Sequence, residues 1–353
     1  MPRIAIRQSP EPIRSTAEFA RHVGLARTTV SRVLNGQPGL KQKTIDRVLQ
    51  AMAETGFSRN AFALYLKGKR TALIGICMES LLRVPAMLKL AALQKRLREE
   101  HYISLIEVLD PEGTYSAVRH FLSMRVEAVV FIGYFAENEI AERIGELSRL
   151  GVPHVVIDHP GVLGANTVTL DRRKAMEELT RHLIGLGHTS FGLLGISEAA
   201  KSTWERLRGI GDALAAHKMT LERNTVSLDH LYPREYNFEF GRVLAKSFAI
   251  VPSRPTAFLS LNDEIGAGAI RGFIESGLKI PGDVSVTGFN NQDLCMASTP
   301  QLTSVDQQIS RTIETAAAML FAQIKNPERG RPMTRRIKPQ LVVRESTGPV
   351  AIS

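Results

Sequence analysis

From residue 72 onward, short apolar segments alternate with amphipathic helical segments, and this alternation constrains the fold more than any other feature. The apolar segments have the length and composition of buried strands: 72–78, 128–132, 154–157, 191–195, 257–261 and 284–288. Between them, apolar residues recur at helical spacing in 87–100, 173–186, 206–217 and 264–276. Strands that alternate with helices predict a parallel α/β sheet.

The alternation restarts near Phe191, where SFGLLGI is similar to the earlier segment TALIGIC. This repetition predicts two similar α/β lobes instead of one long sheet. Ligands of such sheets bind beyond the carboxyl ends of the strands. We therefore expect a ligand-binding crevice between two facing lobes.

The first 70 residues differ from the rest in charge. They hold 13 Lys or Arg and 4 Asp or Glu, which is +9 of the +10 net charge of the 353-residue chain. A small basic module attached to a neutral body indicates a polyanionic partner such as nucleic acid.

Within this module, residues 1–14 are expected to form a flexible tail. A capping box, Ser15 to Glu18, starts a helix that Gly24 ends. A second helix is predicted over 27–34, and a third ends at Gly56. Three short helices with a Gly-containing turn are typical of a helix-turn-helix unit. The alternative, a helical bundle that only packs on another domain, leaves the basic charge unexplained.

Other classes of protein lack support. The chain has no apolar run of 18 residues and no apolar secretory signal at its N-terminus, so we expect a cytoplasmic protein with no membrane partner. Cys77 and Cys295 are its only cysteines, and its histidines show no metal-ligand spacing. No Walker loop, HExxH or GxSxG occurs. The spacing of Gly266, Gly268 and Gly272 inside a predicted helix indicates close helix packing. Neither an enzyme, a metal nor a cofactor is expected.

Residues 20–36, ARHVGLARTTVSRVLNG, resemble the signature of the LacI/GalR (lactose-repressor) family of bacterial transcription regulators. The resemblance covers roughly residues 15–345. It continues in NAFALYL at 60–66, HLIGLGH at 182–188, RPTA at 254–257, ND at 262–263, PGDVSVTGF at 281–289 and TPQLTSV at 299–305.

The resemblance implies a helix-turn-helix domain over 15–58, a hinge over 59–70 and an effector-binding and dimerisation domain over 71–345. That last domain is expected to have the two-lobed fold of periplasmic binding proteins. Its N-lobe would take about 71–162 plus 301–327, and its C-lobe about 163–300 plus 328–345. Residues 346–353 form a tail. The tail has no leucine heptads, and a homodimer is expected.

The resemblance also implies which residues bind double-stranded operator DNA of near-palindromic sequence. They are Arg27, Thr28, Thr29, Ser31, Arg32, Asn35, Lys41, Lys43, Arg59, Asn60, Ala63 and Leu66. Arg27, Thr28 and Arg32 would meet base edges and phosphates, whereas Lys41, Lys43 and Arg59 would contact phosphates.

Within the hinge, Leu66 would insert into the minor groove, or else it packs between domains. Ala26 and Lys41 stand where the family usually has helix-capping hydroxyl residues. Arg59 replaces the usual hinge proline and Leu64 the usual hinge arginine.

By the same resemblance, a small polar effector would lie between the lobes. Its contacts would be Glu79, Arg83, Asp158, Arg206, Tyr236, Asn262 and Asn290. The alternative for each is surface or interlobe hydrogen bonding. Asn290 replaces the usual Asp, and with Arg83 and Arg206 nearby the lost negative charge favours an acidic sugar or another anionic metabolite.

The sequence therefore predicts a DNA-binding regulator, a repressor of a catabolic or transport operon under effector control. A sugar receptor without DNA function is disfavoured by the basic N-terminal module, and an enzyme by the missing catalytic motifs. The operator, the effector and the choice between repression and activation are not defined by the sequence.

Overall fold

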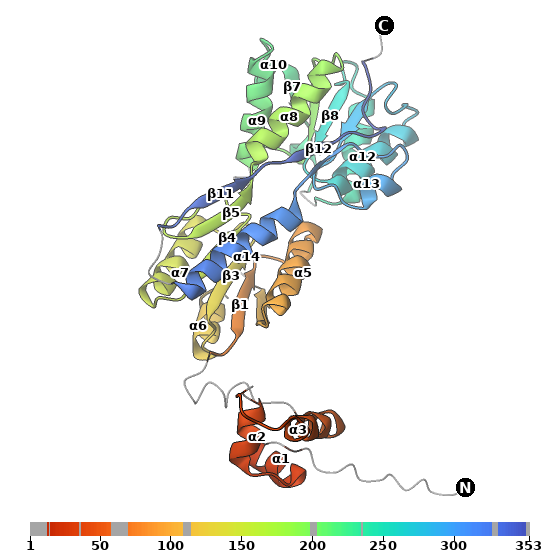
Figure 1. Ribbon diagram of the computed structural model, residues 1–353. Helices are drawn as coiled ribbons and strands as arrows, with labels where there is room; N and C mark the ends of the chain where they lie inside the picture. The colour runs from red at the N-terminus through yellow and green to blue at the C-terminus, as the bar shows by residue number, and fades with distance from the viewer. Residues whose placement is uncertain are drawn as a thin grey trace, which may run out of the picture. The chain divides into compact units, whose positions relative to one another are not determined.

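The computed structural model describes residues 13, 15–34, 37–57, 70–108, 114–197, 203–233, 236–326 and 331–350. The chain divides into two compact units, Met1–Ala72 and Leu73–Ser353 (Figure 1). Within the described ranges, no helix has both the length and the apolar character needed to cross a membrane.

The first unit contains three helices, α1 (Thr16–Val23), α2 (Arg27–Leu34) and α3 (Gln42–Thr55). The Ser15 hydroxyl caps α1 by accepting from the amide of Glu18 at 3.1 Å, and Gly24 ends the helix at φ 71°. The three predicted helices are thus confirmed, and so is the N-cap at Ser15. Phe19 and Phe57 stack with ring centroids 4.1 Å apart in the centre of the small core.

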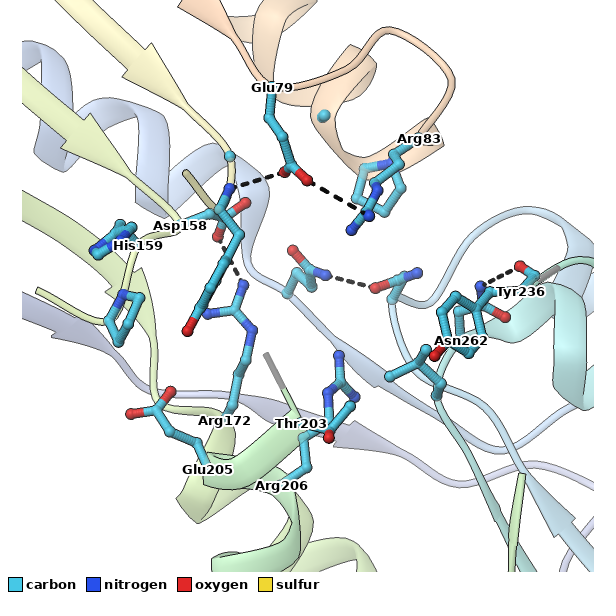
Figure 2. A pocket seen from close by; sticks show the side chains of 18 of the residues that line it. Glu79, Arg83, Asp158, His159, Arg172, Thr203, Glu205, Arg206, Tyr236 and Asn262 are labelled. Carbon is cyan, nitrogen blue, oxygen red and sulfur yellow. Dashed lines mark hydrogen bonds and ion pairs between the residues drawn. The ribbon is translucent and has the colours of Figure 1, made fainter. Parts of the chain in front are cut away.

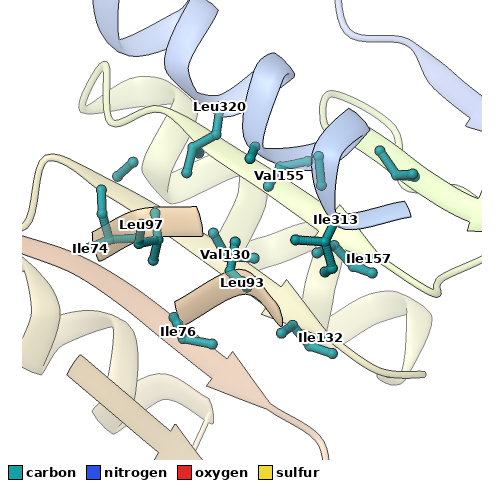
Figure 3. Packing of buried hydrophobic residues seen from close by; sticks show 14 of the residues in the cluster. Ile74, Ile76, Leu93, Leu97, Val130, Ile132, Val155, Ile157, Ile313 and Leu320 are labelled. Carbon is teal, nitrogen blue, oxygen red and sulfur yellow. The ribbon is translucent and has the colours of Figure 1, made fainter. Parts of the chain in front are cut away.

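The first lobe of the second unit contains a parallel six-stranded sheet in the order β11-β5-β4-β3-β1-β2. The strands are β1 (Leu73–Met78), β2 (Ile103–Val108), β3 (Ala128–Ile132), β4 (His154–Ile157), β5 (Asn166–Leu170) and β11 (Thr334–Ile337). Helices α5 (Val84–Glu99) and α14 (Ile309–Lys325) cover one face (Figure 3), and α6 (Thr114–Ser123) and α7 (Glu137–Arg149) cover the other.

The second lobe contains a parallel four-stranded sheet in the order β7-β6-β8-β9. Its strands are β6 (Phe191–Leu194), β7 (Thr225–Ser227), β8 (Ala257–Ser260) and β9 (Ser285–Thr287). Helices α8 (Arg172–Gly185) and α9 (Trp204–Ala215) pack on one face, and α11 (Phe238–Ala249) and α12 (Asp263–Glu275) on the other. Three short helices, α10 (Leu221–Asn224), η2 (Asp229–Leu231) and α13 (Leu294–Ala297), complete the lobe.

Helices α11 and α12 approach each other at glycine. A Cβ added at Gly268 would lie 1.9 Å from the carbonyl oxygen of Phe238, and one at Gly241 would lie 2.1 Å from that of Ile265. This contact confirms that the Gly266–Gly268–Gly272 spacing serves helix packing and not a nucleotide loop.

The expected domain boundaries need correction at two strands and at the expected C-terminal tail. Residues 346–350 of that tail belong to the second lobe, where the amide of Val286 donates to the carbonyl of Ser346 at 2.9 Å and the amide of Val350 donates to the carbonyl of Leu186 at 3.0 Å. Strand β5 was expected in the C-lobe, but it pairs in parallel with β4 and belongs to the first sheet. Strand β11, also expected in the C-lobe, pairs with β5 at the edge of the same sheet. All five residues of β5 are buried, and neighbours on both sides satisfy its backbone.

The chain therefore first leaves the first lobe after β5, at the start of α8. A two-stranded antiparallel ribbon follows later in the chain, formed by β10 (Ser304–Asp306) and β12 (Gln340–Val342). It lies in the segments that connect the lobes, β10 on the way back to the first lobe and β12 on the way from β11 to the second lobe.

Candidate effector-binding cleft and DNA-binding helix

A cleft of about 930 Å3 lies between the two lobes of the second unit. All seven residues predicted to contact an effector line it: Glu79, Arg83, Asp158, Arg206, Tyr236, Asn262 and Asn290. The first six of them are labelled in Figure 2. The structure thus brings together side chains that are up to 211 positions apart, from Glu79 to Asn290. Their surroundings differ, and so does what each one can offer a ligand.

On the first-lobe wall, Glu79 follows β1 and is engaged locally. Its carboxylate accepts from the backbone amide of Tyr134 at 2.8 Å and lies 3.5 Å from the guanidinium of Arg83. Arg83 is at the rim, with its side chain 64% exposed. These two residues therefore shape the mouth of the cleft.

Deeper in the same wall, Asp158 neutralises two cations. It follows β4 with φ 73°, a left-handed conformation that Asp tolerates. Its carboxylate accepts from Lys89 and, at 3.1 Å, from Arg172. Burial by itself would raise the pKa of Asp158, but Lys89 and Arg172 hold that pKa below its usual range.

Lys89 is only 1% exposed, and burial lowers its pKa although Asp158 opposes the shift. Its ammonium also donates to the side chain of Gln307, whose amide in turn donates to Asn290. Asn290 has φ 125° and belongs to the second lobe. A continuous polar chain therefore runs from Arg172 across the cleft to Asn290.

The sequence analysis missed Lys89, Arg172 and Gln307, which all line the cleft. A signal existed for Lys89. It lies on the buried stripe of α5 with Leu93 and Leu97, where a charged side chain is unusual.

On the second-lobe wall, Arg206 lies in the first turn of α9 and is 7% exposed. Its guanidinium carbon lies 3.7 Å from the centroid of the Phe289 ring, and its Nη1 is buried without a hydrogen-bond partner among the described residues. Burial, with a smaller effect of Arg172, lowers the pKa of Arg206 to about 9. This wall therefore holds a desolvated cation that lacks a counter-ion.

Asn262 lines the cleft as expected and also has a structural role. Its Oδ1 accepts from the amide of Ile265 at 2.8 Å, which caps α12, and its Nδ2 donates to the carbonyl of Tyr236 at 3.1 Å. Both ends of the amide are thus used within the lobe. The ring of Tyr236 packs edge-on against Phe240, with centroids 5.8 Å apart, and lines the cleft.

In the first unit, α2 presents several of the residues predicted to bind DNA. Arg27, Thr28 and Arg32 are exposed, as are Lys41 and Lys43 near the start of α3; Thr29 and Ser31 are half-buried. Arg32 donates to the carbonyl of Pro38 at 3.2 Å, so it also fixes the turn between the helices.

Other predicted DNA-binding residues lie outside the described residues, namely Asn35, Arg59, Asn60, Ala63 and Leu66. The absence of a capping hydroxyl at Lys41 has a visible consequence, because the N-terminus of α3 has no side-chain cap.

No cluster of three or more His, Cys, Asp or Glu side chains suited to a metal occurs within the described part of the chain. Both cysteines are buried and free. Burial, followed by nearby Asp263, raises the pKa of Cys295 to about 12, so this thiol is not a reactive nucleophile.

Comparison with known proteins assigns both units. Residues 17–60 match the family described as bacterial regulatory proteins, lacI family, and residues 180–347 match a periplasmic binding protein-like domain. Catabolite control protein A of Staphylococcus xylosus is 29% identical over 295 residues, which cover 83% of this chain and 87% of the relative.

The lactose operon repressor of Escherichia coli (strain K12) is 28% identical over 310 residues, covering 86% of this chain and 83% of the repressor. A crystal structure of the lac repressor dimer bound to operator and the anti-inducer ONPF has a TM-score of 0.82 at 23% identity and covers 96% of this chain and 100% of that one. This likeness shows a shared fold.

Proposed function

This chain belongs to the lacI family of bacterial regulatory proteins, which are DNA-binding transcription regulators, and from this premise we propose that it represses a catabolic or transport operon under the control of a small polar effector. A regulator of this kind works in the bacterial cytoplasm, on nucleoid DNA. The observation that carries the proposal is the cleft, which gathers charged and amide side chains from both lobes in one chain with a basic helix-turn-helix unit.

The cleft suits control by an effector because its two walls belong to different lobes. An effector that contacts both walls binds one arrangement of the lobes better than another, which is the requirement for shifting their equilibrium. The polar chain from Asp158 through Lys89 and Gln307 to Asn290 already connects the walls. A ligand that exchanges hydrogen bonds with this chain therefore changes how the lobes are held.

The DNA-binding side rests on α2. Exposed Arg27 and Thr28 are able to hydrogen-bond base edges, since Arg binds the O6 and N7 atoms of guanine and Thr offers a hydroxyl and a methyl group. Lys41 and Lys43 add phosphate contacts that carry no sequence information. One such unit reads few base pairs, so the proposal includes a homodimer on a near-palindromic operator.

The first lobe offers a surface for this dimer. Edge strand β2 exposes Ile103, Ile106 and Val108, and α5 exposes Met87 and Leu88. An exposed edge strand with apolar side chains is a typical site of association. Ile106→Asp is therefore expected to give a monomer by light scattering. Ile250→Asp, at an exposed apolar site of the second lobe, is the matched control and is expected to leave the dimer intact.

Selection from a random pool of double-stranded DNA tests the function directly. The full chain is expected to enrich one near-palindromic sequence, with an affinity that falls steeply as salt is added because bound phosphates release counterions. The double variant Arg27→Ala, Thr28→Ala is expected to lose the enrichment. Lys325→Ala, which also removes an exposed cation, is expected to retain it. A full chain that enriches no sequence would contradict the proposal.

A further inference from the structure

We propose that the effector carries an anionic group, a carboxylate or a phosphate, and that this group binds Arg206 on the second-lobe wall of the cleft. The inference rests on the proposed function, because it names the chemical class of the effector.

The first observation is the state of Arg206. Its side chain is buried, and among the described residues its Nη1 has no hydrogen-bond partner and no carboxylate lies within ion-pair distance of its guanidinium. A buried charge without a partner is strongly unfavourable, so proteins pair such groups or bind a ligand to them. The ring of Phe289 supports one face of the guanidinium and leaves its edge as the hydrogen-bonding surface.

The second observation is that the nearby acids are already engaged. Asp158 forms ion pairs with Lys89 and Arg172, and Glu205 forms one with Arg336 at 3.0 Å. The lining of the cleft as a whole is balanced in charge, with five acids (Glu79, Glu137, Asp158, Glu205 and Glu264) against five Lys or Arg (Arg83, Lys89, Arg172, Arg206 and Arg208). The buried cation that lacks an ion pair among the described residues is Arg206, since Lys89 and Arg172 pair with Asp158. This local positive charge attracts an anionic group.

The third observation concerns hydrogen-bond donors. Gln292 lines the same cleft, and its Nε2 is also buried without a partner among the described residues. Both unpartnered groups of this wall are donors, so the facing ligand group must supply acceptors. A carboxylate or phosphate offers only acceptors, whereas a sugar hydroxyl also brings a proton that needs an acceptor.

The helices add to this preference. Helices α8 and α9 begin at Arg172 and Trp204, and both of these first residues line the cleft. The positive ends of two helix dipoles therefore face the same space as Arg206, and they stabilise a bound anion.

The experiment compares three probes that share one sugar ring, namely glucose, glucuronate and glucose 6-phosphate, together with inorganic phosphate, all at constant ionic strength. Binding to the full chain is followed by the shift in melting temperature and by calorimetry. We expect at least one anionic sugar and inorganic phosphate to raise the melting temperature in a saturable way, and glucose to have no effect. The relative affinities of glucuronate and glucose 6-phosphate decide between carboxylate and phosphate.

Variants then assign the anion to its residue. Arg206→Gln keeps hydrogen-bond donors but removes the charge, and it is expected to weaken the binding of the anionic probes at least about tenfold, the loss typical of a hydrogen bond to a charged group. Arg181→Gln removes an exposed cation from α8 and is expected to leave their affinity unchanged. Equal binding of glucose and the anionic sugars, an anion response that survives in Arg206→Gln, or no response to any anion would each overturn the inference.

The same protein preparation separates this inference from the proposed function. If selected DNA is bound and released by a neutral sugar alone, the function holds and the anion site does not. If the anionic probes bind through Arg206 but the full chain enriches no DNA sequence, the site holds and the function does not.

Discussion

The two walls of the cleft solve the problem of a buried cation in opposite ways. On the first-lobe wall, the carboxylate of Asp158 binds both Lys89 of the same lobe and Arg172, the first residue of the second-lobe helix α8. On the second-lobe wall, Arg206 is also buried but stacks on Phe289, and no described residue provides it with a counter-ion. The difference indicates that one wall is complete without a ligand, whereas the other stores unfavourable electrostatic energy that a ligand is able to relieve.

The lobes also differ in how their helices pack. In the first lobe, α5 and α14 meet the sheet through large apolar side chains such as Leu93, Ile313 and Leu320. In the second, helix pairs approach closely at glycines: a Cβ at Gly209 of α9 would lie 2.1 Å from the carbonyl of Arg173 in α8. Layers packed by side chains adjust to a small change, but layers in backbone contact do not.

Removing the carboxylate of Asp158, which pairs with Lys89 and Arg172, is expected to have the largest effect on stability. Asp158→Asn removes the carboxylate and leaves two buried cations opposed by none, so the free energy of unfolding is expected to fall by about 3 kcal/mol. Urea unfolding followed by the fluorescence of Trp204, the single tryptophan, measures this loss.

The control for that change is a rescue. Adding Lys89→Met to Asp158→Asn removes one of the two cations and is expected to recover at least half of the lost stability. A double variant no more stable than Asp158→Asn would show that the charge of Lys89 does not depend on Asp158.

The difference in helix packing predicts that a Gly→Ala substitution changes stability in opposite directions in the two lobes. Gly268→Ala forces α11 and α12 apart and is expected to cost about 2 kcal/mol. Gly145→Ala in α7 of the first lobe meets no atom within 4 Å and is expected to gain up to about 1 kcal/mol, because Ala favours the helix. Thermal unfolding of both variants measures the contrast, and equal effects would contradict it.

The sequence predicted six of the ten described strands of the two sheets, those that are continuous apolar runs, and missed β2, β5, β7 and β11. Strands β2 (ISLIEV) and β7 (TVS) lie at sheet edges and are only partly buried, so they lack the continuous apolar run of a buried strand. The six predicted strands are present, with ends within one residue of the expected ones, because buried strands with helices on both faces are continuous apolar runs. Strand β5, NTVTL, was missed because its polar Asn166, Thr167 and Thr169 are buried through pairing and local contacts. Strand β11, TRRI, was missed because two arginines interrupt it.

Prediction of the cleft from the sequence has a similar limit. Family resemblance was sufficient to gather the seven lining residues, but the contacts among the charges were not visible in the sequence. Lys89 meets Asp158 69 positions away and Gln307 218 positions away, and no local pattern encodes such a meeting. Asn262, predicted to contact the effector, also caps α12, a second role that Asn262-Asp263 before a helical stretch could have indicated because Asn is a typical N-cap.

The unpaired wall is expected to become more stable when its cation is removed. Arg206→Met retains contact with the ring of Phe289 and abolishes the buried charge, so the ligand-free protein is expected to gain about 1 kcal/mol in the free energy of unfolding. Urea unfolding without added ligand measures the gain. Arg206→Lys, which keeps a charge at this position, is the control and is expected to give none. A loss of stability in Arg206→Met would mean that the guanidinium has a partner within the protein.

The smallest expected effect concerns pH, and it too differs between the lobes. Burial is the largest cause that lowers the pKa of His182 and His188 in the second lobe and of His159 in the first. The folded state resists protonation of these histidines, whereas the unfolded state binds protons near the usual pKa of 6.5. Their contribution to the free energy of unfolding is therefore fully present above pH 6.5 and is lost as the pH drops through 6.5.

His188 is the best test, since its ring contacts Thr256 at 2.9 Å and Ser285 at 3.1 Å. Urea unfolding is measured between pH 7.5 and pH 5, about the range over which an unperturbed histidine titrates. Over this range the free energy of unfolding is expected to fall less in His188→Gln than in the wild type, although the variant starts from a lower stability. His230→Gln, at an exposed histidine of the same lobe, is expected to retain the wild-type fall. An unchanged pH dependence in His188→Gln would contradict this assignment and would mean that the acid sensitivity arises from other groups, such as His159 in the first lobe or His182.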